Sequence, residues 1–181
     1  MNKKIVILLS VLALLMAGLY SCKTDTALST IEYISRIDVI ATDQTNLTAD
    51  TFAYINFREA EGGPATLIDT IRLHTGRTYA IQLRILDEAS NPILDLTDSI
   101  RHMGDTHLVV YTIDPVSGLI KSSIQDKDSH GLPLGLQSTW QTGDSATGYL
   151  RLILYHQPMG KNGTPTPGNV DFEADYPVVV Q

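Results

Sequence analysis

Hydrophobic and polar residues alternate with a period of two along much of the chain. The clearest run is 79–85, where Tyr, Ile, Leu and Ile alternate with Ala, Gln and Arg, and a second run covers 170–178. Alternate residues point to opposite faces of a strand, so the pattern predicts strands with one face in a core. Further strand candidates are Ile31–Ile40, Phe52–Arg58, Leu67–His74, His107–Ile113, Leu119–Gln125, Gly135–Gln141 and Gly148–His156.

Only one segment has a helical pattern. Leu96–Met103 fits one or two turns, with Thr97 or Asp98 as a cap at its start and Gly104 at its end. Short strands separated by glycine and proline turns favour two packed sheets. The sequence therefore predicts an all-β, antiparallel, immunoglobulin-like β-sandwich of about eight to nine strands with one short helical turn. The strand that contains Pro177 is expected at a sheet edge or a bulge, because proline cannot donate to an interior ladder.

The N-terminus has the layout of a secretory signal. Lys3 and Lys4 precede the apolar run Ile5–Leu15, and the chain's only cysteine, Cys22, follows shortly after. The apolar stretch is shorter than the roughly 18 residues of a spanning helix, which makes a permanent transmembrane anchor the less favoured alternative. A signal that ends at a lone cysteine resembles the lipobox of bacterial lipoproteins. That resemblance implies acylation of Cys22 and removal of the residues before it.

The chain is expected to have three parts. Residues 1–21 form a lipoprotein signal peptide, 22–30 are small and polar and form a flexible tether, and 31–181 form a single β-sandwich domain. We expect a cell-envelope protein, an outer-membrane lipoprotein held to the membrane by its acyl chains. Whether the domain faces the periplasm or the cell surface is open.

The charge balance argues against nucleic acid as a partner. The whole chain carries 13 Lys and Arg against 20 Asp and Glu, a net charge of −7, and loss of Lys3 and Lys4 with the signal makes it −9. An acidic domain of this kind repels phosphate backbones and anionic headgroups.

Common catalytic signatures are missing from the sequence. It has no Gly-x-Ser-x-Gly elbow, no phosphate-binding loop ending in Gly-Lys-Ser/Thr, no His-Glu-x-x-His and no second cysteine. A non-enzymatic protein is therefore expected. A hydrolase is kept as the third hypothesis, since catalytic triads assemble in space and not in sequence.

The stretch 126–131 resembles the opening of a calcium-binding loop. Asp126, Asp128 and Gly131 match three of its positions, but His130 stands where an oxygen ligand is expected and Gln137 cannot supply a bidentate carboxylate. The favoured interpretation is an ordinary acidic hairpin loop in which Asp126 and Asp128 accept hydrogen bonds from turn amides.

Histidines give a second set of metal candidates. His107 and His156 lie on the apolar faces of two predicted strands, and with Asp126 and Asp128 they are the residues we assign as candidate metal ligands. Neutral imidazole binds zinc, copper and haem iron. The alternative, which we favour, is a hydrogen-bonded core histidine at each position. No resident cofactor is expected, and a bound metal ion or haem is the open alternative.

Two further features have a structural and a functional interpretation. Four aromatic residues, Trp140, Tyr149, Tyr155 and Tyr176, fit either a core, which we favour, or a sugar-stacking platform. The loop 157–168 is long and rich in proline and glycine, and fits either a binding loop or a hairpin tip without a role.

Several segments together resemble a family of small Bacteroidota lipoproteins that often carry the label "type 1 periplasmic binding fold superfamily protein". The segments are His107–Tyr111, Asp126–Leu136, Thr139–Gly143, Leu154–Pro158 and Gly168–Val180. The fold in that label requires two lobes of alternating strands and helices, which the pattern of this chain does not offer. The resemblance implies an association with TonB-dependent outer-membrane receptors.

These observations leave three hypotheses about function. The first is a non-enzymatic, membrane-anchored lipoprotein that binds a ligand or a partner as an accessory to TonB-dependent uptake of a nutrient such as a metal or haem. The second is a structural or adhesive surface module, for which the 157–168 loop would matter most. The third is the hydrolase.

Overall fold

The described part of the chain is a sandwich of two β-sheets. The computed structural model describes residues 33–56, 67–115 and 119–181, all of which belong to one compact unit, Glu32–Gln181. The expected signal peptide 1–21, Cys22 and the tether 22–30 lie outside the described residues. Within the described part, no helix has both the length and the apolar character needed to cross a bilayer.

Seven strands form the larger sheet. Its order is β3-β2-β1-β5-β9-β8, with β6 added to β5, and all its pairings are antiparallel. The strands are β1 (Arg36–Asp43), β2 (Ala49–Ile55), β3 (Leu67–Ile68), β5 (Thr78–Asp87), β6 (Leu94–Asp95), β8 (Ile120–Ile124) and β9 (Gln137–Thr142).

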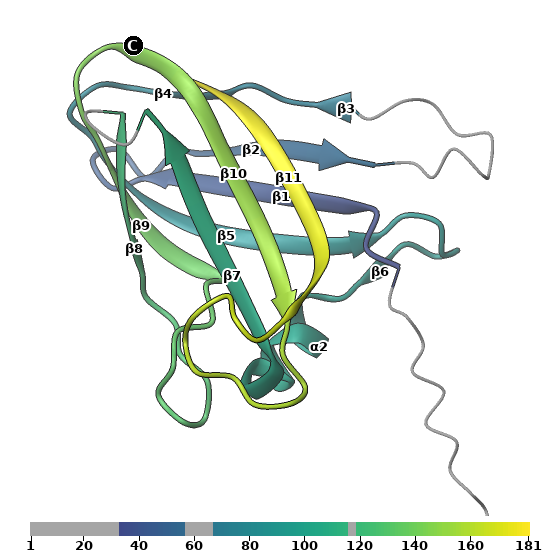
Figure 1. Cartoon of the computed structure of the whole chain (residues 1–181). Coiled ribbons are helices and arrows are strands. Elements are labelled where there is room, and N and C mark those ends of the chain that lie inside the picture. Colours follow the sequence, from purple (N-terminus) through teal and green to yellow (C-terminus); the bar gives the residue numbers. More distant parts are fainter. Residues whose placement is uncertain (1–32, 57–66, 116–118) are drawn as a thin grey trace, which may run out of the picture. The chain divides into compact units, whose positions relative to one another are not determined.

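Four strands form the smaller sheet, which packs across the larger one (Figure 1). Its order is β4-β11-β10-β7, and only the β4–β11 pair is parallel. The strands are β4 (Ile71–Leu73), β7 (His107–Asp114), β10 (Ala146–His156) and β11 (Asn169–Val180). The only helical segments described are α2 (Thr97–His102) and a single 3₁₀ turn, Gly104–Thr106.

The core lies between the sheets and follows the alternation in the sequence. Ile37, Ile81 and Ile85 point inward from the larger sheet, and Leu150 and Leu152 meet them from the smaller one. Each such side chain contributes about 1.5–3 kcal/mol when it is fully buried. The Tyr176 hydroxyl donates to the Ile37 carbonyl oxygen at 2.8 Å, which ties the two sheets together.

The predicted all-β sandwich is confirmed. Eleven strands are described instead of eight or nine, because the predicted strand 67–74 divides into β3 and β4 and because the two-residue strand β6 is too short to show a period. The predicted helix is present as α2 without a side-chain cap. The Thr97 hydroxyl instead accepts a hydrogen bond from the main-chain N–H of Ile85.

Pro177 lies where β11 has one neighbour. Strand β4 pairs with β11 only over Val178–Val180, whereas Pro177 is paired with Tyr149 of β10. The missing N–H therefore interrupts no ladder on the other side. The prediction of an edge strand or a bulge at Pro177 is wrong for the strand as a whole, because β11 lies between β4 and β10 and its register shift is at Leu154/Tyr155.

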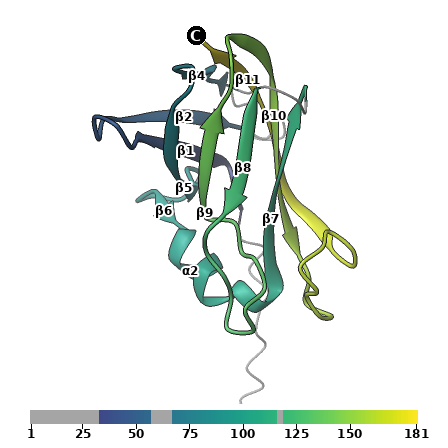
Figure 2. The same ribbon diagram turned by 90° about the vertical axis from the view of Figure 1, so that its left-hand side faces the viewer.

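The two sides of the sandwich differ. On one side, which we call the closed edge (67–73), the chain runs from β3 in the larger sheet directly into β4 in the smaller sheet. On the other side, which we call the open edge, β7 ends one sheet and β8 ends the other. Figure 2 shows these two strands toward the viewer.

Candidate functional site

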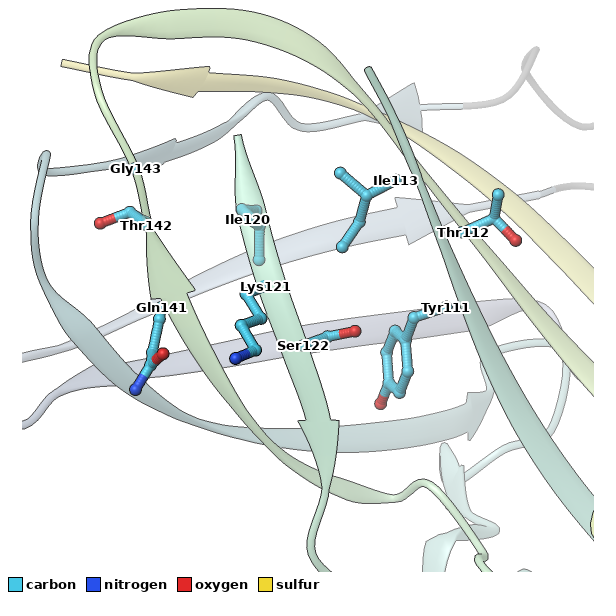
Figure 3. A pocket seen from close by; sticks show the side chains of 9 residues that line it. All are labelled: Tyr111, Thr112, Ile113, Ile120, Lys121, Ser122, Gln141, Thr142 and Gly143. Carbon is cyan, nitrogen blue, oxygen red and sulfur yellow. The ribbon is translucent and has the colours of Figure 1, made fainter. Parts of the chain in front are cut away.

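A pocket of about 680 Å³ occupies the open edge (Figure 3). Side chains of β7 and β8 line its two sides, and the end of β9 completes it. This volume lies within the range of about 300–1,000 Å³ that is typical of ligand sites. The lining residues are Tyr111, Thr112, Ile113, Ile120, Lys121, Ser122, Gln141, Thr142 and Gly143.

The main chain of β7 presents hydrogen-bonding groups to this pocket. Val109 donates its N–H to the Leu134 carbonyl oxygen at 2.7 Å, on the side of β7 away from β10, whereas the Thr106 carbonyl accepts the N–H of Gln157 at the end of β10. Because successive residues of an antiparallel strand bond to opposite sides, the N–H groups of Tyr111 and Ile113 also point away from β10. They face the open edge.

Strand β8 presents its own groups from the opposite side. Gln125 donates its N–H to Gln137, and the carbonyl of Leu119 accepts the N–H of Gly143, so the odd-numbered residues here bond toward β9. By the same alternation, the main-chain groups of Ile120 and Ser122 point outward. Among the described residues, no strand pairs with the outer side of β7 or of β8.

Trp140 lies next to two of the lining residues. It is the register partner of Ser122, and its ring meets that of Tyr111 edge to face at 6.0 Å. The indole is 0% exposed, and its Nε1 has no hydrogen-bond partner among the described residues. Burial raises the pKa of Tyr111, so its hydroxyl stays protonated and donates to the Gly135 carbonyl oxygen at 2.5 Å.

The segment 134–136 closes the part of the open edge that lies beside the start of β7. Its Leu134 carbonyl accepts from Val109 of β7, and its Leu136 carbonyl accepts the N–H of Leu83 in β5 at 2.9 Å. Gly135 lies between them with φ +94°, and a Cβ at this position would stand 2.6 Å from the Val109 carbonyl oxygen. Only glycine fits this approach without displacing β7.

Asp126 and Asp128 hold this segment in place. The carboxylate of Asp126 accepts the N–H groups of Gly135 at 2.8 Å and Leu136 at 3.0 Å. One oxygen of Asp128 accepts the N–H groups of His130 at 2.9 Å and Leu132 at 2.8 Å. These are the turn-amide hydrogen bonds that the ordinary-loop interpretation predicts.

The second oxygen of Asp128 forms a buried ion pair with Lys161. The Lys161 Nζ lies 2.9 Å from Asp128 Oδ2, with the two side chains 1% and 0% exposed, and donates to the Gly104 carbonyl at 2.9 Å. Burial by itself raises the pKa of Asp128, but the bonds from Lys161 and from the amides of Leu132 and His130 outweigh it and lower that pKa. Lys161 thus fastens the long 157–168 loop to the 126–136 loop.

A small cluster with two carboxylates joins the 126–136 loop to the 3₁₀ turn Gly104–Thr106. Among the described residues, Asp105, Asp128 and His130 are the one group of three whose candidate ligand atoms lie within 4.8 Å of one another. Ser129 donates to Asp105 through its N–H and its hydroxyl, and Lys161 pairs with Asp128. Both carboxylates therefore already have partners, Ser129 for Asp105 and the Lys161 ammonium for Asp128.

His107 and His156 come together across β7 and β10. They are register partners, and their rings stack with centroids 4.9 Å apart and planes 11° from parallel. The Nδ1 of His107 lies 2.9 Å from the Met103 carbonyl, and its Nε2 lies 3.9 Å from Asp171 Oδ2. Strand β11 has a register shift here that leaves Asp171 opposite no residue of β10. The sequence alone did not point to Asp171, because a bulge is not visible in a period-two pattern.

The aromatic residues do not form one platform. Trp140 and Tyr176 are 0% exposed and belong to the core, as predicted, whereas Tyr149 is 60% exposed and not part of the core. In the 157–168 loop, Gln157 donates to the Thr164 and Pro167 carbonyls at 2.6 Å, so the loop is braced internally.

Sequence reasoning gave no sign of the open-edge pocket, although seven of its nine lining residues come from predicted strands. Alternation places Tyr111 and Ile113 on an inner face, but it does not reveal which strands end the sheets. Comparisons of the chain with family models, with curated proteins and with solved structures give no match. The function of this chain must therefore be inferred from its own sequence and geometry.

Proposed function

We propose that this chain is a lipid-anchored, non-enzymatic binding module of the bacterial cell envelope, whose ligand or partner enters the open edge between β7 and β8. The observation that carries the proposal is the pocket of about 680 Å³ between two sheet edges with outward-facing main-chain groups. Concave sites with apolar walls and a few polar groups are the usual ligand sites of small domains.

The chemistry of the lining favours binding over catalysis. Lys121 is its only charged residue, and hydroxyl and amide groups supply the remaining polarity. Ser122 and Thr142 have no histidine, aspartate or glutamate beside them in the lining that would act as a base. A hydroxyl nucleophile needs such a partner within hydrogen-bond reach.

The N-terminal sequence supports the location. Acyl chains on Cys22 would hold the domain at the outer membrane through the tether 22–30. The resemblance to lipoproteins that accompany TonB-dependent receptors supports a role beside such a receptor, where the module captures or hands over a nutrient.

A complementation experiment tests this function. A strain that lacks the protein is grown under iron, zinc or copper limitation and complemented with the wild type, Ser122→Trp or Ser123→Trp. Ser122 lines the pocket and is half-buried, whereas its neighbour Ser123 is exposed and outside the lining. We expect a growth defect that Ser123→Trp repairs and Ser122→Trp does not.

Two controls complete that experiment. Matched denaturation midpoints for the two tryptophan variants show that both are folded, and Cys22→Ala tests the anchor. Equal growth of the deletion and wild-type strains in all three media would contradict a role in metal uptake. Full repair by a folded Ser122→Trp would contradict the open edge as the site.

The stacked histidines favour one second candidate, the capture of a metal ion or haem. His107 and His156 are adjacent across two strands, and Asp171 lies near them. Zinc, copper and haem titrations of the wild type, of His107→Ala/His156→Ala and of the control His74→Ala test it. Unchanged binding in the double variant removes these residues as ligands. Asp126 and Asp128 enter the same titrations as asparagine variants, which we expect to alter loop stability more than metal binding.

A further inference from the structure

We infer that the open edge takes an extended peptide segment of a partner protein, which adds to β7 as one more strand. This inference rests on the proposed function and names the kind of partner that the pocket fits. A peptide in the β conformation is recognised mainly through its main chain, with pockets for alternate side chains.

The first support is the direction of the main-chain groups of β7. Tyr111 and Ile113 present their N–H and C=O groups to the pocket, because Val109, two residues earlier, bonds outward to Leu134. An extended polypeptide offers matching donors and acceptors at the same two-residue interval. A sugar or a small rigid ligand has no such repeat.

The second support is that the chain itself already pairs a segment with this edge. The Leu134 carbonyl accepts the Val109 N–H, and the chain then turns at Gly135 toward Leu83 of β5. The internal segment therefore ends just where the outward-facing groups of Tyr111 and Ile113 begin. A guest strand would continue the same line of hydrogen bonds along β7.

Charge and length favour β7 over β8 as the strand that receives the guest. Strand β8 has five residues and carries the exposed Lys121, and an exposed lysine is a common means of keeping an edge strand from pairing. Strand β7 has eight residues, and its lining residues Tyr111, Thr112 and Ile113 are uncharged.

The walls of the pocket define the guest's side chains. Alternate side chains of a strand on β7 would point inward, toward Ile113, Ile120 and Ser122. The walls suit apolar or hydroxyl-bearing side chains at these positions. The side chains between them would face solvent and are left unspecified.

Amide hydrogen exchange of the ¹⁵N-labelled mature chain in detergent micelles provides the first test. In the protein alone, the amide of Val109 should exchange slowly, and those of Tyr111 and Ile113 faster by at least about tenfold. The amide of Thr112, which points to β10, serves as the control and should be slow. Slow exchange at Tyr111 and Ile113 in the protein alone would overturn the inference. If that protection rises with protein concentration, the occupant is a second copy of the chain.

Photo-crosslinking in the native envelope supplies the probe for the second test. A benzoylphenylalanine at Thr112 lies in the lining, whereas one at the exposed Thr147 of β10 is the control. The segment that crosslinks only through position 112 is then made as a synthetic peptide. Its binding should slow exchange at Tyr111 and Ile113 by at least about tenfold and leave Thr112 unchanged.

Backbone methylation of that peptide identifies main-chain recognition. In a bound strand only every second amide faces β7. Methyl groups on that set of alternate amides should weaken binding by at least about tenfold, and methyl groups on the other set should not. Equal effects of the two sets, or no polypeptide crosslinked at position 112, would overturn the inference. The proposed function fails separately, by full repair of growth with Ser122→Trp. Loss of repair by Ser122→Trp, with no change in exchange at Tyr111 and Ile113, would keep the binding module and reject the peptide.

Discussion

The closed edge and the open edge differ in how the chain covers the main-chain groups of the strands that end the two sheets. Every sandwich has two sides where strands end the sheets and leave main-chain groups unpaired. On the closed edge, β3 pairs with β2, and the chain continues into β4, which pairs with β11, so one segment serves both sheets. Asp69 strengthens the crossing, because its N–H donates to Ala53 and its carboxylate accepts the Ala53 N–H, both at 2.9 Å.

No segment does this for the whole of the open edge among the residues that the structure describes. The segment 134–136 bridges β7 and β5 only near Val109, toward the start of β7. The pocket lies beside Tyr111–Ile113, toward the end of β7. The closure near Val109 depends on polar anchors, namely Asp126, Asp128 and Lys161. A connecting segment thus joins the two sheets on the closed edge, whereas on the open edge such a segment covers only part of β7.

The largest expected effect comes from removing the buried cation behind the partial closure. Lys161→Ala leaves the Asp128 carboxylate, 0% exposed, without its ammonium partner. Loss of one partner of a buried ion pair costs roughly 3–5 kcal/mol of unfolding free energy. Chemical denaturation measures this, with Lys127→Ala, an exposed lysine of the same loop, as the control at less than about 0.5 kcal/mol. Equal midpoints for the two variants would show that the loop needs no such anchor.

The next effect concerns the close contact between Gly135, in the segment 134–136, and Val109 of β7. Gly135→Ala puts a Cβ 2.6 Å from the Val109 carbonyl oxygen at a positive φ, and we expect a loss of about 2–4 kcal/mol in unfolding free energy. Gly131→Ala is the matched control, since Gly131 also has a positive φ but has no atom within 4 Å of an added Cβ. It should lose only about 1–2 kcal/mol. If the two variants were equally stable, the segment 134–136 would not press on β7.

Much of the architecture was predictable from local pattern, whereas the site was not. Alternation in 79–85 and 170–178 is the direct result of burying one face of β5 and of β11, so those strands are visible in the sequence. Which strands end the sheets depends on how distant segments pair, and Tyr111 shows the same alternation at an edge as it would inside a sheet. Lys161 illustrates the same limit, because a lysine in a Pro/Gly-rich loop resembles a solvated one until Asp128 is brought to it by the fold.

Acid should gradually weaken the contacts that the carboxylates of Asp105 and Asp128 make with the 126–136 loop and with Lys161. The pKa of Asp105 is lowered by hydrogen bonds from Ser129, and that of Asp128 is lowered although burial opposes it. A carboxyl with a lower pKa in the folded state stabilises the fold fully above its unfolded pKa of about 3.9 and loses that effect as the pH falls through the folded value. Unfolding free energy should therefore decrease as the pH falls below about 4.

A variant separates this titration from general acid unfolding. In Asp105→Asn the amide does not titrate, so the decrease of unfolding free energy with falling pH should be shallower than in the wild type. Denaturation at a series of pH values measures both profiles. If they were parallel, the Asp105 carboxylate would have the same proton affinity in the folded and in the unfolded state.

The smallest effect on stability, and the most direct comparison of the two edges, is expected from Lys121→Thr. Lys121 is an exposed residue of β8 and packs into no core, so the unfolding free energy should change by less than about 0.5 kcal/mol. The same change removes the charge that discourages strand pairing at the open edge, so dimers or larger species should increase with protein concentration in size-exclusion chromatography. Arg72→Thr on β4 is the matched control, because it removes an exposed charge from the closed edge, where the chain passes from one sheet into the other. Self-association of Lys121→Thr but not of Arg72→Thr would show that only the β7–β8 side offers pairing groups to another chain. If neither variant self-associated more than the wild type, the charge of Lys121 would not be what keeps β8 from pairing.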